Sequence, residues 1–161
     1  MKRVVLALGG NVGDVPNVFG VVLKYLQDLG ALENISRSRT YRSRSLLKDG
    51  QPDYYNCVCA SYTPLSPSDL LRLLKETELL FGRQNQEQRW RERTIDIDII
   101  DYGASIVRED NLVIPHPQMA SRSFVLFPMK EVDPTYINPE SGLTIKQMCC
   151  ALEDNLNIMV V

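Results

Sequence analysis

Residues 94–102 read TIDIDIIDY and predict the strand that completes the core fold. In a β-strand, successive side chains point to opposite faces. The isoleucines that alternate with Asp96 and Asp98 therefore share one face, and the two aspartates share the other. Because aspartate is uncommon in strands, two of them on one face require a reason beyond simple exposure.

Upstream of this strand the sequence predicts five further elements. Short apolar or aromatic runs predict strands, and apolar residues at helical spacing predict helices. In chain order we expect a strand at 3–8, a helix at 18–29, strands at 35–41 and 54–62, a helix at 66–81 and the strand at 94–102. This order is that of the ferredoxin-like arrangement. We expect an α+β fold whose antiparallel sheet carries both helices on one face. The residues after Tyr102, with a short helix near 145–152, form a C-terminal elaboration.

The ends of the two predicted helices are marked by particular residues. Ser66 is a capping residue, Pro67 suits the first helical position, and Asp69 lies three residues after the cap. Gly30 and Gly82 stand where a helix C-terminal glycine belongs. Both helices therefore have defined lengths.

Composition places the chain among ordinary globular proteins. It has 161 residues, 44% of them apolar and 24% charged, which suits a single domain over residues 1–161. The net charge of −2 disfavours a general nucleic-acid binder, which would usually be basic. No stretch has the length that a bilayer crossing needs. The four cysteines form no C-x-x-C pair, so we expect reduced thiols in a cytoplasmic protein.

The spacing of Asp96 and Asp98 suits a divalent cation. Their Cα atoms would lie about 6.5–7 Å apart, so the carboxylates can lean together and share one ion or hold two. Mg²⁺ is commonly bound by one or two carboxylates together with substrate phosphates. An isolated pattern of this kind is more typical of an amphipathic strand with its aspartates in water. The flanking residues therefore decide between a metal site and a solvent-exposed strand face.

The residues just before the strand supply groups that bind phosphate. Arg83, Arg89, Arg91 and Arg93 lie there, and Trp90 stands among them. A guanidinium group matches phosphate oxygens, and an aromatic ring beside it can stack on a purine. Carboxylates for Mg²⁺ next to arginines for phosphate are what phosphoryl transfer needs, since its catalysis is mainly positioning and charge stabilisation.

Three other features are open to two interpretations. His116, the only histidine, lies between two prolines and close to Arg122, and it is either structural or a phosphate ligand. Asn56 either faces a ligand or is an ordinary hydrogen-bonded strand residue. The basic run between Asn34 and Lys48 is more often a solvated face than a binding site.

Several motifs together resemble one enzyme family. They are LALGGNVGD at 6–14, QPDYYN at 51–56, FGR at 81–83, RW at 89–90, RTIDIDIIDYG at 93–103 and IPHPQMASRSFVLFPMKEVDP at 114–134. In this order they resemble the 6-hydroxymethyl-7,8-dihydropterin pyrophosphokinases of folate biosynthesis and span most of the chain. The resemblance implies an enzyme that moves the pyrophosphoryl unit of ATP to the pterin hydroxymethyl oxygen and releases AMP. We expect a monomer that binds neither nucleic acid nor a membrane.

The resemblance also implies a role for each site residue. Asp96 and Asp98 would bind two Mg²⁺ ions that bridge the ATP phosphates, and Arg83 and Arg93 would stabilise the transferring group. The residues on the ATP side would be Glu78, Arg89, Trp90, Ile99, His116 and Arg122. The residues around the pterin would be Asn11, Ser43, Leu46, Tyr54, Asn56 and Phe124.

The sequence departs from the family's usual pattern in four places, one of them a pair of residues. They are Gly10 in place of serine, Arg44 in place of proline, Asn85 in place of a basic residue found in some relatives, and Arg91-Glu92 in place of Gly-Pro. The paired aspartates and the key arginines remain, so we expect activity to be retained. One alternative is a ferredoxin-like RNA-binding module, but its Lys/Arg-Gly-Phe signature is missing from the sequence. Another is a non-catalytic module that binds a small ligand, which would not need aspartates that hold Mg²⁺.

Overall fold

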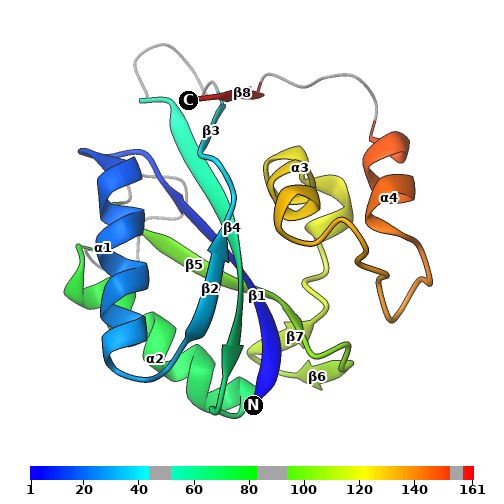
Figure 1. The fold of residues 1–161 in the computed structure, drawn as a ribbon, viewed down its shortest axis with the longest axis horizontal. Coiled ribbons are helices and arrows are strands. Elements are labelled where there is room, and N and C mark those ends of the chain that lie inside the picture. The colour runs from blue at the N-terminus through cyan, green and yellow to red at the C-terminus, as the bar shows by residue number, and fades with distance from the viewer. Residues whose placement is uncertain (44–51, 83–93, 153–157) are drawn as a thin grey trace.

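The computed structural model describes residues 1–43, 52–82, 94–152 and 158–161, and it contains one main antiparallel sheet with helices on both faces (Figure 1). The sheet runs from β5 (Asp96–Tyr102) through β1 (Lys2–Gly10) to β4 (Tyr54–Thr63). Beyond β4 lie β2 (Glu33–Arg37) and β3 (Tyr41–Ser43), which pair with different stretches of it, and β8 (Ile158–Val160), which pairs with β3.

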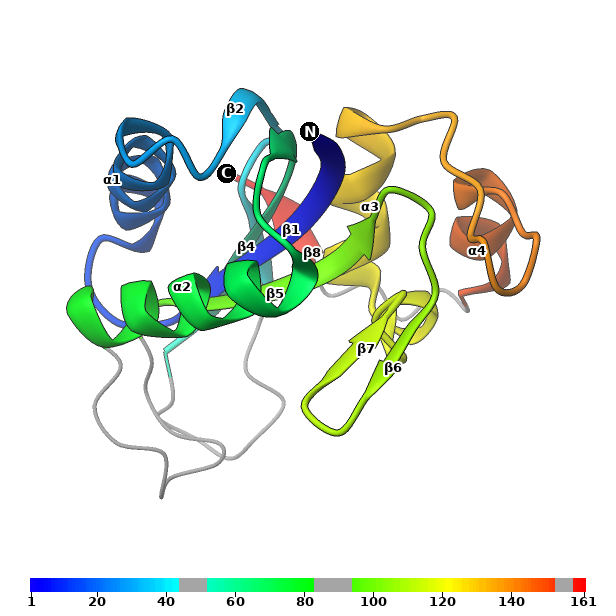
Figure 2. The same ribbon diagram turned by 90° about the horizontal axis from the view of Figure 1, so that it is seen from below.

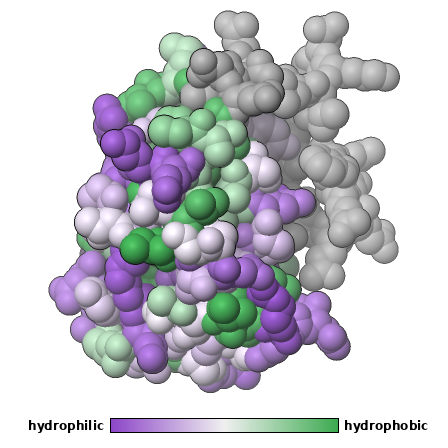
Figure 3. Space-filling model, turned by 90° about the vertical axis from the view of Figure 1, so that its right-hand side faces the viewer, coloured by the Kyte–Doolittle hydropathy of each residue, from purple (hydrophilic) through white to green (hydrophobic). Residues whose placement is uncertain are grey.

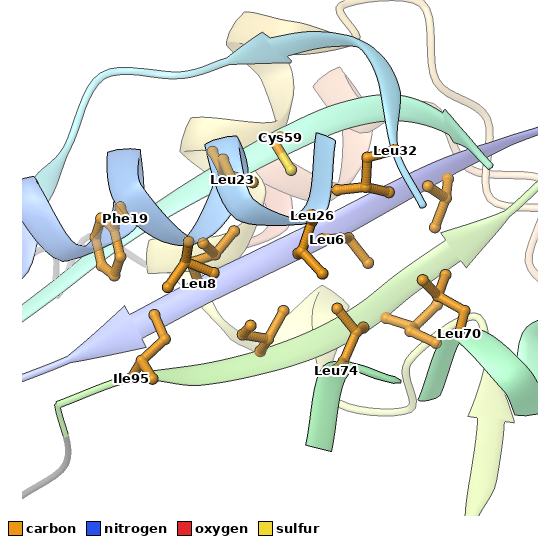
Figure 4. Packing of buried hydrophobic residues seen from close by; sticks show 14 of the residues in the cluster. Leu6, Leu8, Phe19, Leu23, Leu26, Leu32, Cys59, Leu70, Leu74 and Ile95 are labelled. Atoms are coloured by element: carbon orange, nitrogen blue, oxygen red, sulfur yellow. The ribbon is translucent and has the colours of Figure 1, made fainter. Parts of the chain in front are cut away.

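The first core lies between the sheet and the two long helices, α1 (Val15–Asp28) and α2 (Pro67–Leu80). Leu6 and Leu8 of β1 alternate with residues of the opposite face, and they meet Phe19 of α1 and Leu74 of α2 in this core (Figure 4). Apolar residues at helical spacing give each helix one buried face. The predicted ferredoxin-like order, with both main helices on one face, is confirmed, as is the α+β class.

The second core lies on the opposite face of the same sheet. Here α3 (Ser123–Val132) and α4 (Ile145–Ala151) cover the strands, as Figure 2 shows from below. Val5, Val58 and Ile100 of the strands pack with apolar residues of these helices. The remaining elements are a hairpin of β6 (Val107–Glu109) and β7 (Leu112–Ile114) and a short 3₁₀ helix, η1 (Met119–Ser121). Seen from outside, this side carries interspersed hydrophilic and hydrophobic residues (Figure 3).

Two details of the sheet differ from the expectation. The single strand expected at 35–41 is divided into β2 and β3, because Ser38 takes over part of the strand pairing. Its N–H donates to the Val58 carbonyl over 2.9 Å, and its Oγ accepts from the Val58 N–H over 3.0 Å. The C-terminal strand β8 was not expected, since its residues carry no strand pattern long enough to recognise.

The ends of α2 follow the sequence closely. The Ser66 Oγ accepts a hydrogen bond from the Asp69 N–H over 3.1 Å, and Pro67 takes the first helical position. Gly82 follows the helix with φ +115°, a backbone conformation that favours glycine. In the described part of the chain, no helix combines the length and apolar character that a membrane crossing requires.

Gly20 offers a test of helix energetics away from any site. It is an exposed glycine inside α1, and an added Cβ would meet only the Arg37 Nη1, at 3.8 Å. We expect Gly20→Ala to raise the free energy of unfolding by about 0.5–1 kcal/mol, because glycine loses more backbone freedom than alanine in a helix. Urea titration at neutral pH measures the change, and a lowered midpoint would contradict it.

Candidate active site

One row of residues crosses the sheet on its α3 face. Asp96 of β5 pairs with Gly9 of β1, Gly9 pairs with Asn56 of β4, and Asn56 pairs with Tyr41 of β3. Directly paired residues of antiparallel strands point to the same face. The side chains of Asp96 and Asn56 therefore lie on the same face as Asp98, which pairs with Ala7. The sequence predicted the shared face of the aspartates, but not which strand residues stand beside them.

Arg122 is the described basic residue closest to the aspartates. Its Nη1 lies 3.8 Å from the Asp98 Oδ2, and about a third of each side chain is exposed. The guanidinium carbon stands 5.7 Å from the centre of the Phe124 ring, and Nη2 donates to the Gln118 Oε1. Arg122 occupies the N-cap position of α3, where its carbonyl accepts from the Val125 and Leu126 N–H groups, so the helix start holds this residue at the acidic edge of the sheet.

His116 is held by the main chain next to the aspartates. The main-chain N–H of His116 donates to the Ile100 carbonyl over 2.9 Å, and the ring Nδ1 accepts from the Gln118 main-chain N–H over 3.1 Å. Burial lowers the pKa of the imidazole, while Asp98 raises it in part. The ring is therefore neutral at pH 7. Since Nδ1 is an acceptor, the proton resides on Nε2, which can donate to an anion.

Glu78 and Ile99 lie on the other side of β5 from the aspartates. Glu78 is fully buried on α2, and its carboxylate accepts from the Ile97 N–H over 2.7 Å and from the Lys75 Nζ over 2.9 Å. Burial raises the pKa of Glu78, and Lys75 opposes this shift. The Ile99 side chain belongs to the first core. In a strand, the main-chain N–H groups of residues i and i+2 point to the same edge. The Ile99 N–H therefore faces the outer edge of β5, as the Ile97 N–H does.

The described residues among those predicted to surround the pterin come from β3, β4, the segment after β1 and the first turn of α3. Ser43 ends β3 and pairs with Tyr54, which begins β4. Asn11 follows β1 and is buried. Phe124 lies in the first turn of α3 and packs on the second core. The structure thus brings strand ends and the start of α3 to one face, which spacing alone could not show.

Glycines shape the site in a way that the sequence did not reveal. A Cβ on Gly9 would lie 2.9 Å from the Asn56 Oδ1, so the carboxamide of Asn56 rests over Gly9. A Cβ on Gly10 would lie 2.5 Å from the Thr94 carbonyl oxygen, and one on Gly82 would lie 2.9 Å from the Thr94 Oγ1. Thr94 is thus held between the ends of β1 and α2, immediately before β5. The only signal for this role was the presence of glycine where the element ends meet.

Several predicted residues lie outside the described part of the chain. They are Leu46, Arg83, Arg89, Trp90 and Arg93, and the departures Arg44, Asn85 and Arg91-Glu92 lie there too. Among the residues that are described, no group of three or more histidine, cysteine or acidic side chains is arranged to hold a metal ion. Within the described residues Asp96 and Asp98 are thus the candidate donors, and two carboxylates fit an ion that completes its shell with phosphate oxygens and water.

Comparison with known proteins identifies the family. Residues 5–134 match the family described as 7,8-dihydro-6-hydroxymethylpterin-pyrophosphokinase (HPPK). The chain belongs to the HPPK family. The 2-amino-4-hydroxy-6-hydroxymethyldihydropteridine pyrophosphokinase of Synechocystis sp. is 40% identical over 144 residues, covering 89% of this chain and 73% of the relative. The enzyme of the same name from Aquifex aeolicus is 32% identical, covering 95% of this chain and 99% of the relative. The family resemblance seen in the motifs is confirmed, and with it the class of enzyme, a pyrophosphokinase.

Solved structures of HPPK-DHPS from Plasmodium falciparum have the same fold. The S436F/A437G/A613S triple mutant with SDX-DHP matches 99% of this chain with a TM-score of 0.76 and 14% identity. The wild type with SDX-DHP matches 93% of this chain with a TM-score of 0.71 and 17% identity. This chain spans less than half of either structure, 45% and 43% respectively. At this level of identity the likeness supports the fold of this chain and nothing further.

Proposed function

We propose that this chain transfers the β,γ-pyrophosphoryl group of ATP to 6-hydroxymethyl-7,8-dihydropterin, giving the pterin diphosphate and AMP in folate biosynthesis. The observation that carries the proposal is the row from Asp96 through Gly9 to Asn56 on one face of the sheet. Neighbouring strands are about 4.8 Å apart, so the acidic end and the amide end of the row are separated by roughly 10 Å. This span suits a phosphate chain at one end and a flat heterocycle at the other.

The reaction needs little covalent chemistry from the protein. The pterin hydroxymethyl oxygen bonds to the β-phosphorus, and the bond from that phosphorus to the oxygen bridging the α-phosphate breaks. AMP leaves with the bridging oxygen, and the hydroxyl proton is released. The protein's contribution is to align the two substrates and to stabilise charge on the phosphate oxygens.

On the ATP side, charge and hydrogen-bond donors surround the proposed phosphate position. Asp96 and Asp98 would hold Mg²⁺, with two ions proposed, and the metal would neutralise phosphate charge. Arg122 and the Nε2 proton of His116 would donate to phosphate oxygens. Arg83 and Arg93 would stabilise the transferring group. The remaining residues proposed for the nucleotide are Glu78, Arg89, Trp90 and Ile99, where Glu78 acts by fixing the β5 edge and Ile99 by its main chain.

On the pterin side, the proposed residues offer amides, hydroxyls and rings. Asn56 and Asn11 would hydrogen-bond the heterocycle, and the rings of Tyr54 and Phe124 would stack on it. Ser43 and Leu46 complete the proposed set. Hydrogen bonding to a polar heterocycle gives strong discrimination, because an analogue that lacks the group leaves a buried amide unpaired.

We propose further that residues 1–161 act as one pyrophosphokinase domain, as a monomer in the cytoplasm. The two cores share the strands of one sheet, which supports a single unit. All four cysteines are free thiols, which suits a reducing compartment.

Product analysis tests the proposal directly. The protein is incubated with ATP, Mg²⁺ and the reduced pterin alcohol, and nucleotides are separated by chromatography. We expect AMP to form in a 1:1 ratio with pterin diphosphate and only in the presence of the pterin. Formation of ADP, or binding of pterin without any AMP, would contradict it.

The hydrogen bonds of His116 make a prediction about its role. We expect His116→Ala to raise the KM for ATP about tenfold, since one hydrogen bond to a charged phosphate is worth about 1.5–3 kcal/mol. Glutamine places an amide nitrogen near the position of Nε2, so His116→Gln should keep most of the affinity. Because burial lowers the pKa of the imidazole, His116 is already neutral at pH 7. The wild-type KM for ATP should therefore not rise between pH 7 and pH 8 from deprotonation of His116. Equal losses in both variants would argue against a donor role.

A further inference from the structure

Outside the proposed substrate-binding residues, a compact cluster joins β3 to the end of α3. Glu131 in the last turn of α3 accepts three hydrogen bonds from Arg39, from the main-chain N–H over 3.0 Å, from Nε over 3.0 Å and from Nη2 over 2.8 Å. The Tyr41 hydroxyl donates to the same carboxylate. Tyr41 is 8% exposed, and burial raises its pKa to about 12, so it remains a donor throughout the working pH range.

The helix that carries Glu131 crosses the whole width of the site. Its start places Arg122 beside Asp98 of β5, and its last turn places Glu131 beside Tyr41 of β3. Nine residue steps of a helix span about 13 Å. The three strand spacings from β5 to β3 amount to about 14 Å. Helix α3 therefore extends across the strands from β5 to β3, and Glu131 fixes the end of the helix that lies at β3.

The strand that Glu131 holds continues directly into the proposed pterin side. Tyr41 pairs with Asn56, and Ser43, two residues further along β3, pairs with Tyr54. On its other edge β3 is paired with β8, where Val160 faces Tyr41. Strand β3 is thus paired along both edges, with β4 and with β8. The Glu131 cluster adds a contact between one face of β3 and α3. Loss of the Glu131 contacts would let β3, and with it Ser43 and the paired Asn56, shift relative to α3.

We propose that Glu131 is a positioning residue for the pterin side, which holds β3 against α3 through Tyr41 and Arg39 and so sets the position of Ser43 and Asn56 relative to α3. The proposal rests on the proposed function, since it concerns how the pterin is held. It assigns to Glu131 no contact with either substrate.

Kinetics of two Glu131 variants separate positioning from simple stabilisation. We expect Glu131→Ala to raise the KM for the pterin about tenfold while kcat and the KM for ATP change less than about threefold, since small displacements of binding groups are costly. Glu131→Gln keeps one acceptor oxygen for Tyr41 and the guanidinium, so the pterin KM should recover to within about threefold of wild type. Equal effects of both variants on every constant would overturn the proposal.

Asp133→Ala supplies a matched control on the same end of α3. Asp133 also forms an ion pair over 2.8 Å and is mostly buried, but its partner is Arg3 of β1 rather than β3. Asp133→Ala should lower the unfolding midpoint and leave the pterin KM within about twofold. A tenfold rise in the pterin KM in this variant would show general loosening of α3 and contradict a specific role for Glu131.

The decisive measurement is calorimetric titration of the pterin onto each variant in the presence of Mg²⁺ and a nonhydrolysable ATP analogue. We expect Glu131→Ala to weaken pterin binding about tenfold and Tyr41→Phe to weaken it by a smaller factor, with the double variant no worse than Glu131→Ala alone. Additive losses would show that the two residues act separately and would overturn the proposal. If the wild-type protein bound the pterin but formed no AMP, the proposed function would be contradicted, but the role of Glu131 would not. The comparison of pterin affinities between variants does not depend on turnover.

Discussion

Asp98→Asn is expected to lower kcat about 10²- to 10³-fold while the fold survives. Asparagine keeps the shape of aspartate and one oxygen, but removes the charge that a divalent cation needs at this position. The loss of one preorganised electrostatic group at a reacting centre typically has this magnitude. Asp98 is only a third exposed and lies 3.8 Å from Arg122, so the change also removes the carboxylate charge beside that cation. We expect Asp96→Asn to behave in the same way, since both residues face the same side of β5.

Mg²⁺ dependence gives the measurement. Turnover is followed as AMP release over a range of Mg²⁺ concentrations, and the thermal shift caused by Mg²⁺ with a nonhydrolysable ATP analogue is recorded for each variant. We expect the Mg²⁺ concentration for half-maximal turnover to rise and the thermal shift to shrink. Near wild-type turnover in either variant would remove the metal-binding assignment.

Asp101 on the same strand is the matched control. It is buried, accepts a hydrogen bond from the Tyr136 hydroxyl over 3.1 Å, and its pKa is raised by burial. Asp101→Asn is therefore a mild change in a structural hydrogen-bond pair. It should alter the unfolding midpoint but not the Mg²⁺ dependence. Matching Mg²⁺ effects in Asp98→Asn and Asp101→Asn would indicate a general disturbance of β5.

The local sequence was sufficient to predict the core of the fold. The two-residue alternation in TIDIDIIDY gave β5 its faces, and the Ser66 cap gave α2 its start, because both signals depend on neighbours in the chain. Helix α3 was not predicted, since Pro128 lies within it and its buried residues serve a sheet face formed elsewhere in the sequence. Such elements depend on long-range packing, which no local pattern encodes.

The chemistry of the candidate site could be proposed from the sequence, but the arrangement of its residues could not. The paired aspartates follow from strand geometry, and His116 beside Arg122 was open to a structural or a phosphate-binding interpretation, whereas the role proposed for Phe124 came from resemblance to a family. No spacing in the sequence could show that Asn56 rests over Gly9, or that Glu131 reaches β3 from a helix some 90 residues later. These contacts arise from strand register and from the crossing of α3, both of which are set by the assembled sheet.

The register of β1 leads to the second large effect, at Gly9. We expect Gly9→Ala to lower kcat/KM for the pterin about 10²-fold with little change in the KM for ATP. The added Cβ would lie 2.9 Å from the Asn56 Oδ1, closer than such atoms approach, so the carboxamide must turn away. The contact is with the far end of a flexible side chain and the backbone needs no unusual φ, so the fold should survive. A displacement of about 1 Å in a substrate-binding group can have an effect of this size.

Steady-state kinetics with each substrate varied in turn measure the effect, and Gly20→Ala serves as the control. Both variants add one methyl group at a glycine, but Gly20 lies on α1, on the other face of the sheet from Asn56. Gly20→Ala should therefore leave every kinetic constant unchanged. The Asn56→Ala variant has no carboxamide to displace, so adding Gly9→Ala to it should cause little further loss of kcat/KM for the pterin. A full 10²-fold loss from Gly9→Ala in the Asn56→Ala background would show that the methyl group acts on something other than Asn56.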